Sequence, residues 1–217
     1  MNDKKFCFIM SSNNKQYEYE SMLYINDLKT PDGYIVDHII IHDAISMTSG
    51  YNKAMKSSDA KYKIYLHQDV FILNKNFLFD LLYYFSDKST GMIGMAGSPK
   101  FPKNCTMWYG YRIGTFNSNN IYSSCYNELQ KVTVPTNVEA IDGFLMATQY
   151  DLSWREDLFN GWDFYDVSQS FEFRKAGYNI IIPPSDTPWC FHDDGIMNLT
   201  NYNENRKLFR EYYKDML

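Results

Sequence analysis

The chain has 217 residues, 45% of them hydrophobic and 22% charged, which is ordinary for a globular protein and excludes disorder, a collagen-like repeat and a coiled coil. Its net charge is -5, with 26 acidic and 21 basic residues. An acidic chain without a basic run is not expected to bind nucleic acid or an anionic membrane through charge alone. An anionic ligand would require a metal ion or a local dipole to supply positive charge.

Apolar runs and helix signals alternate along the first part of the chain. Strands are predicted at residues 6–10, 35–42 and 62–66. Helices are predicted at about 15–28 with Tyr19, Met22 and Leu23 on one face, at about 48–57 after a cap at Thr48 or Ser49, and at 77–85 after a cap at Asn74. This alternation predicts an α/β fold with a mostly parallel central sheet flanked by helices.

The second part of the chain is less regular. Strands are predicted at 92–96, 138–148 and 178–182, a helix at 165–176 ended by Gly177, and a charged amphipathic helix at 203–217. Residues 98–131 are rich in Asn, Ser, Tyr and Gly and show little periodicity. A segment of that length inside a compact domain is usually functional, so we expect it to contribute to a binding site.

The cysteines give no sign of a zinc knuckle or a thioredoxin-like motif, because none of the four lies in a C-x-x-C pair. A reducing compartment fits this pattern. The first ten residues contain too short an apolar stretch for a signal peptide, and no window reaches the roughly 18 apolar residues of a membrane span. We therefore expect a cytoplasmic protein without a transmembrane segment, for which peripheral membrane contact stays open.

Polar residues follow three predicted strands, at Ser11–Asn14, at His42 and Asp43, and at His67–Asp69. Ligands of open α/β sheets bind beyond the carboxyl ends of the strands, so these groups are expected at one edge. The sequence contains neither G-x-G-x-x-G nor G-x-x-x-x-G-K-[ST], which disfavours a dinucleotide site and a P-loop.

Two clusters have the chemistry of metal ligands. Asp69 offers an oxygen for Mg²⁺ or Mn²⁺, and His192 offers a ring nitrogen. The alternatives are that Asp69 caps the following segment, that His67 is a polar residue at the sheet edge, and that His192–Gly195 is a turn.

Asp163 and Asp166 lie at the start of the predicted 165–176 helix. They can act as general base for a hydroxyl nucleophile, or they can simply cap the helix. Nearby Trp162, and Trp108 with Tyr109 in the irregular segment, offer flat faces for a sugar ring, although either Trp can equally belong to the core.

The order of these motifs resembles the family 2-type glycosyltransferases with the GT-A nucleotide-diphospho-sugar transferase fold, in particular a small bacterial branch with a His-Gln-Asp variant of the metal motif. The resemblance rests on Ser11–Asn13, on Gly50–Met55 before Tyr62–Val70, on Asp142–Met146, and on Gly161–Asp166 continuing through Phe171–Tyr178. It covers most of residues 5–195. It implies one domain over 1–217, with a nucleotide-sugar-binding half (5–97), an acceptor and catalytic half (98–195) and a C-terminal helix (196–217).

Roles for individual residues follow from the resemblance. It assigns the divalent metal, Mn²⁺ or Mg²⁺, to Asp69 and His192, the nucleotide-sugar to Ser11, Ser12, Asp43, Asn52, His67 and Gln68, and catalysis to Asp166 with its neighbour Asp163. The implied reaction is inverting transfer of a sugar from a nucleoside-diphosphate donor to a hydroxyl of a glycan, a lipid-linked glycan or a small molecule, in polysaccharide or glycoconjugate biosynthesis. The alternatives are an inactive nucleotide-sugar-binding module of the same fold and a nucleotidyltransferase.

Overall fold

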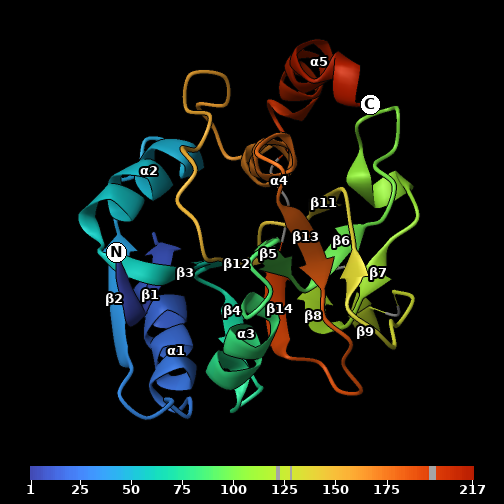
Figure 1. Cartoon of the computed structure of the whole chain (residues 1–217). Coiled ribbons are helices and arrows are strands. Elements are labelled where there is room, and N and C mark those ends of the chain that lie inside the picture. Colours follow the sequence, from blue (N-terminus) through green and yellow to red (C-terminus); the bar gives the residue numbers. More distant parts are fainter. Residues whose placement is uncertain (121–122, 128, 196–198) are drawn as a thin grey trace.

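The computed structural model describes residues 1–120, 123–127, 129–195 and 199–217 (Figure 1). The helices are α1 (Lys15–Asn26), α2 (Met47–Ser57), α3 (Phe77–Phe85), α4 (Tyr165–Lys175) and α5 (Tyr202–Tyr212). The strands are β1 (Asn2–Ser11), β2 (Ile35–Ile41), β3 (Ala60–His67), β4 (Val70–Ile72), β5 (Thr90–Gly94), β6 (Ala96–Ser98), β7 (Ile113–Gly114), β8 (Phe116–Asn120), β9 (Ser123–Asn127), β10 (Thr136–Asn137), β11 (Ala140–Ile141), β12 (Leu145–Thr148), β13 (Asn179–Ile182) and β14 (Cys190–Gly195).

The main sheet has the strand order β10-β13-β5-β12-β3-β1-β2 (Figure 1). β1 is parallel to β2 and β3, and β5 and β13 run in the same direction as these three. β12 and β10 run the other way, so the sheet is mixed. The prediction of an α/β fold with a mostly parallel sheet is confirmed. Two smaller sheets have the orders β11-β6-β7 and β4-β14-β8-β9.

The main sheet is covered on both faces, and β1 shows why its sequence is a continuous apolar run. Successive side chains of a strand point to opposite faces. Phe6 and Phe8 pack in a buried cluster with residues of α1 and α3, whereas Cys7 and Ile9 pack in a second cluster with residues of α2 and α4. Because both faces are buried, polar alternation is absent from this strand.

A third buried cluster joins α4 to α5, which lies at the periphery of the molecule above α4 in Figure 1. Phe171 of α4 packs edge-on against Phe209 of α5, with ring centroids 4.9 Å apart. Phe209 is fully buried although most of α5 is polar and exposed, which confirms the predicted amphipathic helix packed on the outside. None of the described helices is long and apolar enough to cross a membrane.

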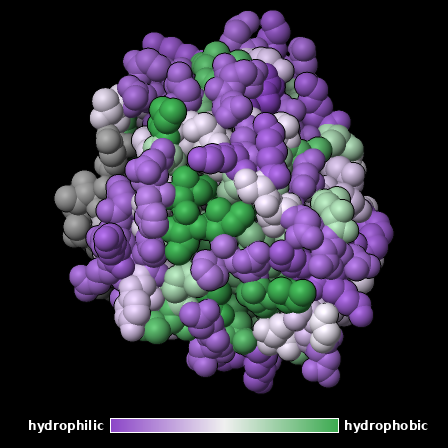
Figure 2. Space-filling model, turned by 90° about the vertical axis from the view of Figure 1, so that its left-hand side faces the viewer, coloured by the Kyte–Doolittle hydropathy of each residue, from purple (hydrophilic) through white to green (hydrophobic). Residues whose placement is uncertain are grey.

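β2 is an edge strand of the main sheet, and Figure 2 views the molecule from the side on which it lies. This face is mostly hydrophilic, with apolar residues gathered near its middle. Ile35 of β2 is 55% exposed, but Asp37 on the same strand pairs with Lys5 at 3.1 Å. Charged residues on an edge strand disfavour pairing with another chain.

The predicted apolar face of α1 is not its most buried side, and the N-caps predicted for α2 and α3 are wrong. Tyr19 and Leu23 of α1 are exposed, and Ser21 and Ile25 are the buried residues. The Ser21 hydroxyl donates to the carbonyl of Val70 at 2.9 Å, which places this side of α1 against β4.

The cap of α2 is Ser46 rather than Thr48 or Ser49. Ser46 and Ser49 form a capping box, in which each side chain bonds the backbone N–H of the other residue. Asn74 is not the N-cap of α3 either: the N-cap is Asn76, whose backbone N–H donates to the Asn74 side chain at 3.0 Å.

The predicted strand at 138–148 is interrupted at Asp142–Phe144 and forms two strands in different sheets, β11 and β12. The Asp142 carboxylate accepts a hydrogen bond from the backbone N–H of Phe144, which closes a local turn. The interruption has a consequence for the site, because it turns the backbone N–H of Gly143 toward α4.

Candidate active site

A cleft of about 360 Å³ lies at the carboxyl ends of β1 and β3. Its lining residues are Ser11, Ser12, Asn13, His42, Ala44, Met47, His67, Gln68, Asp69 and Trp162. Ser11 is level with both Ile41 and His67 in the sheet, so the three parallel strands end at the same height. The polar strand ends that the sequence predicts at one edge are therefore brought together.

His67, Asp69 and His192 form a group in which one ligand atom from each residue lies within 4.8 Å of the others. His192 reaches the group because β14 is antiparallel to β4 and places it opposite Val70, next to Asp69. His192 Nε2 is 3.5 Å from Asp69 Oδ1 and 4.0 Å from Asp194 Oδ1. His67 was predicted to contact the nucleotide sugar. Its position also makes it a potential metal ligand.

The residues of this group fit a divalent cation. Asp69 Oδ1 is buried and has no hydrogen-bond partner among the described residues, which is costly unless a cation completes its surroundings. One carboxylate oxygen with two imidazole nitrogens suits a transition-metal ion such as Mn²⁺ better than Mg²⁺, which prefers oxygen ligands alone.

The charges in the group influence one another. Burial lowers the pKa of His67, and the neighbouring His192 lowers it further. Burial would also lower the pKa of His192, but the carboxylates of Asp69 and Asp194 outweigh it and raise that pKa. Burial would raise the pKa of Asp69, yet the electrostatic attraction of the nearby imidazoles, with His192 Nε2 3.5 Å from Asp69 Oδ1, leaves this pKa below its ordinary value. The group therefore holds an ionised carboxylate beside a neutral His67 near pH 7.

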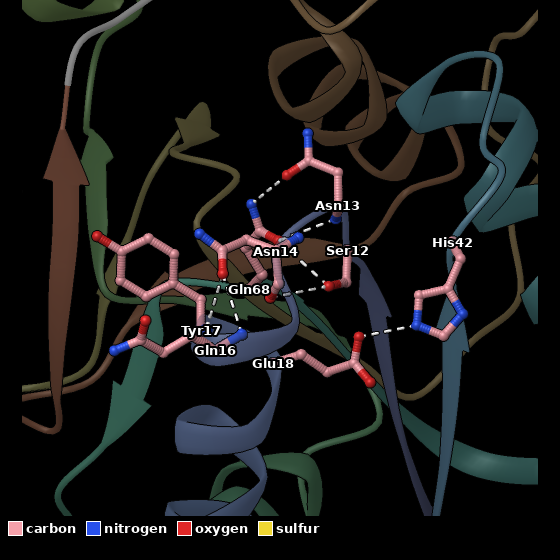
Figure 3. A network of polar contacts seen from close by, with 8 residues as sticks. All are labelled: Ser12, Asn13, Asn14, Gln16, Tyr17, Glu18, His42 and Gln68. Atoms are coloured by element: carbon pink, nitrogen blue, oxygen red, sulfur yellow. Dashed lines mark hydrogen bonds and ion pairs between the residues drawn. The ribbon is translucent and has the colours of Figure 1, made fainter.

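Gln68 points its side chain at the loop between β1 and α1 (Figure 3). Its Oε1 accepts hydrogen bonds from the backbone N–H groups of Asn13 and Asn14, at 3.0 and 2.8 Å, and from the Ser12 hydroxyl at 3.2 Å. Its Nε2 donates to Asn13 Oδ1 at 2.9 Å. Gln68 thus ties the end of β3 to the loop that lines the cleft.

Two other predicted nucleotide contacts, Ser12 and Asp43, differ in how deeply they are buried. Ser12 is buried and bonded to Gln68, whereas Asp43 is exposed beside the cleft residues His42 and Ala44. His42 itself pairs with Glu18 at 2.8 Å (Figure 3).

Asn52 is not brought to the cleft. It is buried on α2, and its amide both donates to the carbonyl and accepts from the N–H of Trp154, at 2.9 Å each. The structure therefore gives Asn52 the task of holding Trp154 in the core.

Asp166 lies in the first turn of α4 and is half-buried. Its Oδ2 accepts a hydrogen bond from the backbone N–H of Gly143 at 3.0 Å. Burial, together with the charge of Asp142, raises the pKa of Asp166 to about 7. A carboxyl group with such a pKa is suited to accept a proton near neutral pH.

The residue before α4 has an unusual backbone. Phe164 adopts the left-handed conformation at φ 61°, which is rare for a bulky residue and marks a locally strained turn. Its buried ring packs in the third cluster and holds that turn in place. Asp163 precedes it, and burial raises the pKa of its carboxyl. The strained turn thus separates the two predicted catalytic acids.

Tyr165, for which no role was predicted, directly precedes Asp166 and contacts the metal group. Its hydroxyl is hydrogen-bonded to His67 Nε2, which fixes the ring that faces Asp69. Gly143 lies directly against Tyr165, because a Cβ atom at position 143 would be 2.2 Å from the Tyr165 hydroxyl oxygen. This contact explains the glycine in the Asp142–Met146 motif.

Asp142 is the other site residue for which no role was predicted, although it begins the Asp142–Met146 motif. Its Oδ1 accepts from the N–H of Phe144 and its Oδ2 accepts from the indole N–H of Trp108 at 2.8 Å. Its charge acts on Asp166 and on both histidines of the metal group. A carboxylate directly before the Gly143 turn was the available signal.

Comparison with known proteins gives one family and a set of similar folds. A model of the family described as "Glycosyltransferase like family" matches residues 7–213. No curated protein matches the sequence. Among solved structures, the chain is similar to the mannosyltransferase PcManGT from Pyrobaculum calidifontis in complex with GDP-Man and Mn²⁺, with 11% identity and a TM-score of 0.62 over 99% of this chain and 65% of that one.

The chain is also similar to S. aureus TarS 1-349 in complex with UDP, with 11% identity and a TM-score of 0.57 over 94% of this chain and 64% of that one. A further match is TarS 1-349 with UDP-GlcNAc, with 10% identity and a TM-score of 0.53 over 90% and 59%. The chain therefore spans less than two thirds of the length of these structures. At such low identity the likeness shows the fold alone, and it confirms the predicted GT-A fold.

Proposed function

The chain belongs to the glycosyltransferase-like family, and from this premise we propose that it transfers a sugar from a nucleoside-diphosphate donor to an acceptor hydroxyl, with inversion and with a divalent metal ion. One observation carries the proposal. A potential metal group is joined through the His67–Tyr165 hydrogen bond to the start of α4, where Asp166 has a pKa of about 7.

Asp166 acts as the general base in this proposal. It takes the proton of the acceptor hydroxyl while the acceptor oxygen forms its bond to the anomeric carbon. The bond between that carbon and the donor phosphate breaks at the same time, and the nucleoside diphosphate leaves with the electron pair. The hydrogen bond from Gly143 orients the Asp166 carboxylate for this step.

Asp69, His192 and His67 would hold the divalent ion. When bound, such an ion neutralises the charge that develops on the departing diphosphate, which is needed in a chain with a net charge of -5. Tyr165 positions His67 within this group. The solved neighbours named with UDP-GlcNAc, or with GDP-Man and Mn²⁺, support a nucleotide sugar and a transition-metal ion as the classes of ligand.

The cleft beyond the metal group would take the nucleoside. Ser11 at the end of β1 and Ser12 directly after it line the cleft, and Trp162 offers an exposed ring from the loop before α4. Gln68 would act indirectly by fixing the loop that follows β1. Asp43 stays proposed as the contact to the base, since it is exposed at the rim beside Ala44.

A second candidate is a nucleotide-sugar-binding module without transferase activity. It is favoured by the His-Gln-Asp variant of the metal motif, in which His67 takes the place of a carboxylate. Donor turnover decides between the two candidates.

The test is a thermal-shift series with UDP, GDP, dTDP and CDP, each with and without Mn²⁺, followed by donor turnover with the nucleotide that binds. A ligand that binds only the native state raises the melting temperature. We expect an Mn²⁺-dependent shift with one nucleotide and turnover of the corresponding nucleotide sugar. A thermal shift without turnover of any tested sugar and acceptor would support the inactive binding module. The absence of a shift with every nucleotide would overturn the proposed donor site.

A further inference from the structure

Beside the proposed base lies a small surface formed by Trp108 and Arg112, here called the Trp108–Arg112 shelf. Trp108 is 38% exposed, and its indole N–H donates to Asp142 Oδ2 at 2.8 Å. The next residue, Gly143, donates its backbone N–H to Asp166 Oδ2 at 3.0 Å. Two adjacent residues therefore tie the shelf to the carboxyl group that is proposed to activate the acceptor.

Arg112 has no counter-ion among the described residues. Its guanidinium carbon lies 4.4 Å from the centroid of the Trp108 ring, which fixes the orientation of the cation. Arg155 and Arg174, by contrast, pair with carboxylates, at 2.7 Å to Asp157 and at 3.2 Å to Glu139.

Arg112 is also partly withdrawn from water. Its side chain is half-buried, and burial lowers its pKa although the charge of Asp142 opposes that effect. A partly desolvated guanidinium that forms no ion pair is energetically unfavourable. A bound oxyanion would stabilise it, because its planar N–H donors match a carboxylate or a phosphate.

We infer that the Trp108–Arg112 shelf is an acceptor subsite for a sugar that carries a carboxylate or a phosphate. The inference rests on the proposed transferase function and adds the chemical class of the acceptor. The exposed part of the Trp108 indole contacts the sugar, and Arg112 binds its oxyanion. Asp166, at the other end of the Asp142–Gly143 connection, takes the proton of the reacting hydroxyl.

The diphosphate of the donor is the other possible source of an oxyanion, and the geometry favours the acceptor. Arg112 is not among the residues that line the cleft. The donor diphosphate would already be neutralised by the ion held at Asp69 and His192. The shelf instead connects to Asp166, where the acceptor hydroxyl must lie.

The test compares sugars with and without an acidic group. Methyl β-glucuronide, glucose 6-phosphate and neutral methyl β-glucoside are titrated by calorimetry into the full chain with Mn²⁺ and UDP or GDP present. We expect at least one acidic sugar to bind about tenfold more tightly than the glucoside, as for a hydrogen bond to a charged group. Arg112→Gln should remove this preference and leave the affinity for the glucoside within twofold.

Lys207→Gln is the matched control, because it removes one positive charge from α5 and should keep the preference. Equal binding of all three sugars by the wild-type chain, or an unchanged preference in Arg112→Gln, would overturn the subsite. If Arg112→Gln weakens UDP or GDP binding and the wild-type chain shows no preference, the oxyanion belongs to the donor and the acceptor assignment is wrong. Failure of every nucleotide to bind would count against the transferase function, whereas the sugar titrations test the subsite separately.

Discussion

The proposed donor edge, at Ser11–Asn14 and His67–Asp69, and the proposed acceptor side, around Trp108 and Arg112, are built in opposite ways. Beside the metal group, polar side chains of the donor edge bond one another: Gln68 bonds the loop after β1, and His42 pairs with Glu18 (Figure 3). On the acceptor side, Arg112 has no counter-ion among the described residues, and Tyr109 is 82% exposed. The loop of the donor edge is thus held by the protein's own side chains, whereas on the acceptor side Arg112 and Tyr109 can contact a partner.

This contrast agrees with how the two regions are made. The donor edge consists of the ends of parallel strands, which the sheet register holds level. The proposed acceptor side lies in the connection between β6 and β7, which contains a short 3-10 helix at Met107–Tyr109 and where binding groups can vary without disturbing the main sheet. A scaffold of this kind can keep one donor chemistry while its acceptor changes.

The largest expected effect separates catalysis on the acceptor side from binding at the donor edge. Asp166→Asn keeps an oxygen for the Gly143 N–H but cannot accept a proton, so transfer should fall about 10³-fold, within the range typical of general bases. Nucleotide binding should stay within twofold of the wild-type affinity. Steady-state transfer rates and nucleotide titrations measure the two quantities.

Asp163→Asn is the control for that variant, since it alters the neighbouring acid beyond the strained Phe164 turn. We expect less than a tenfold loss. A nearly inactive Asp163→Asn beside an active Asp166→Asn would assign the base to Asp163 instead.

The next effect concerns the metal group of the donor edge. Asp69→Asn removes the charged oxygen that lies 3.5 Å from His192, so Mn²⁺ binding should weaken roughly a hundredfold, at least as much as loss of an outer-shell partner costs. The Mn²⁺-dependent part of the nucleotide thermal shift should disappear. Asp32→Asn, at an exposed turn, should keep it. An unchanged Mn²⁺ dependence in Asp69→Asn would remove Asp69 from the metal site.

The pH dependence of transfer should report Asp166, and the raised pKa of this carboxyl fixes its sign. The folded protein holds the proton more tightly than a free carboxyl with a pKa of 3.8, and about 7 is the folded value. The stability from this group is present below pH 3.8 and is lost as the pH rises through about 7. Activity changes in the opposite direction, because only the ionised form is a base.

At low substrate concentration, kcat/KM should therefore rise about tenfold per pH unit up to pH 7 and level off above it. Melting temperatures across the same range should decline with pH in the wild-type chain and less so in Asp166→Asn. A kcat/KM that stays constant down to pH 5 would contradict the assignment.

Much of the donor edge could be predicted because its signals are local. The apolar runs of β1 and β3 end in polar residues, and parallel strands bring such ends together, as Ser11 and His67 show. The metal group required the resemblance, since Asp69 and His192 lie far apart in the sequence and meet through the pairing of β4 with β14.

What could not be predicted depends on contacts between distant segments. The side chain of Gln68 is hydrogen-bonded to a loop 54 to 56 residues away, and that of Asn52 to Trp154, 102 residues away. Neither side chain is therefore free to bind the nucleotide as predicted. The orientation of α1 was wrong because the contact of Ser21 with Val70, not the apolar pattern, decides which side is buried. The positions of Tyr165 and Asp142 in the site could not be predicted, because they depend on the contacts of α4 with His67 and with the Gly143 turn.

The smallest expected effect tests whether the donor edge is organised in advance. Gln68→Leu keeps the volume but removes the bonds to Ser12, Asn13 and Asn14, and the free energy of unfolding should fall by about 1 kcal/mol, because water can replace the exposed bonds. KM for the donor should rise several-fold while kcat changes less than twofold, because the loop is proposed to contact the nucleoside and not the reacting atoms. Gln68→Glu still accepts from both backbone N–H groups, so its KM should lie between those of the wild type and Gln68→Leu. If Gln68→Leu keeps the wild-type KM at lower stability, the loop is ordered by the nucleotide itself, and the donor edge would be as open before binding as the Trp108–Arg112 shelf.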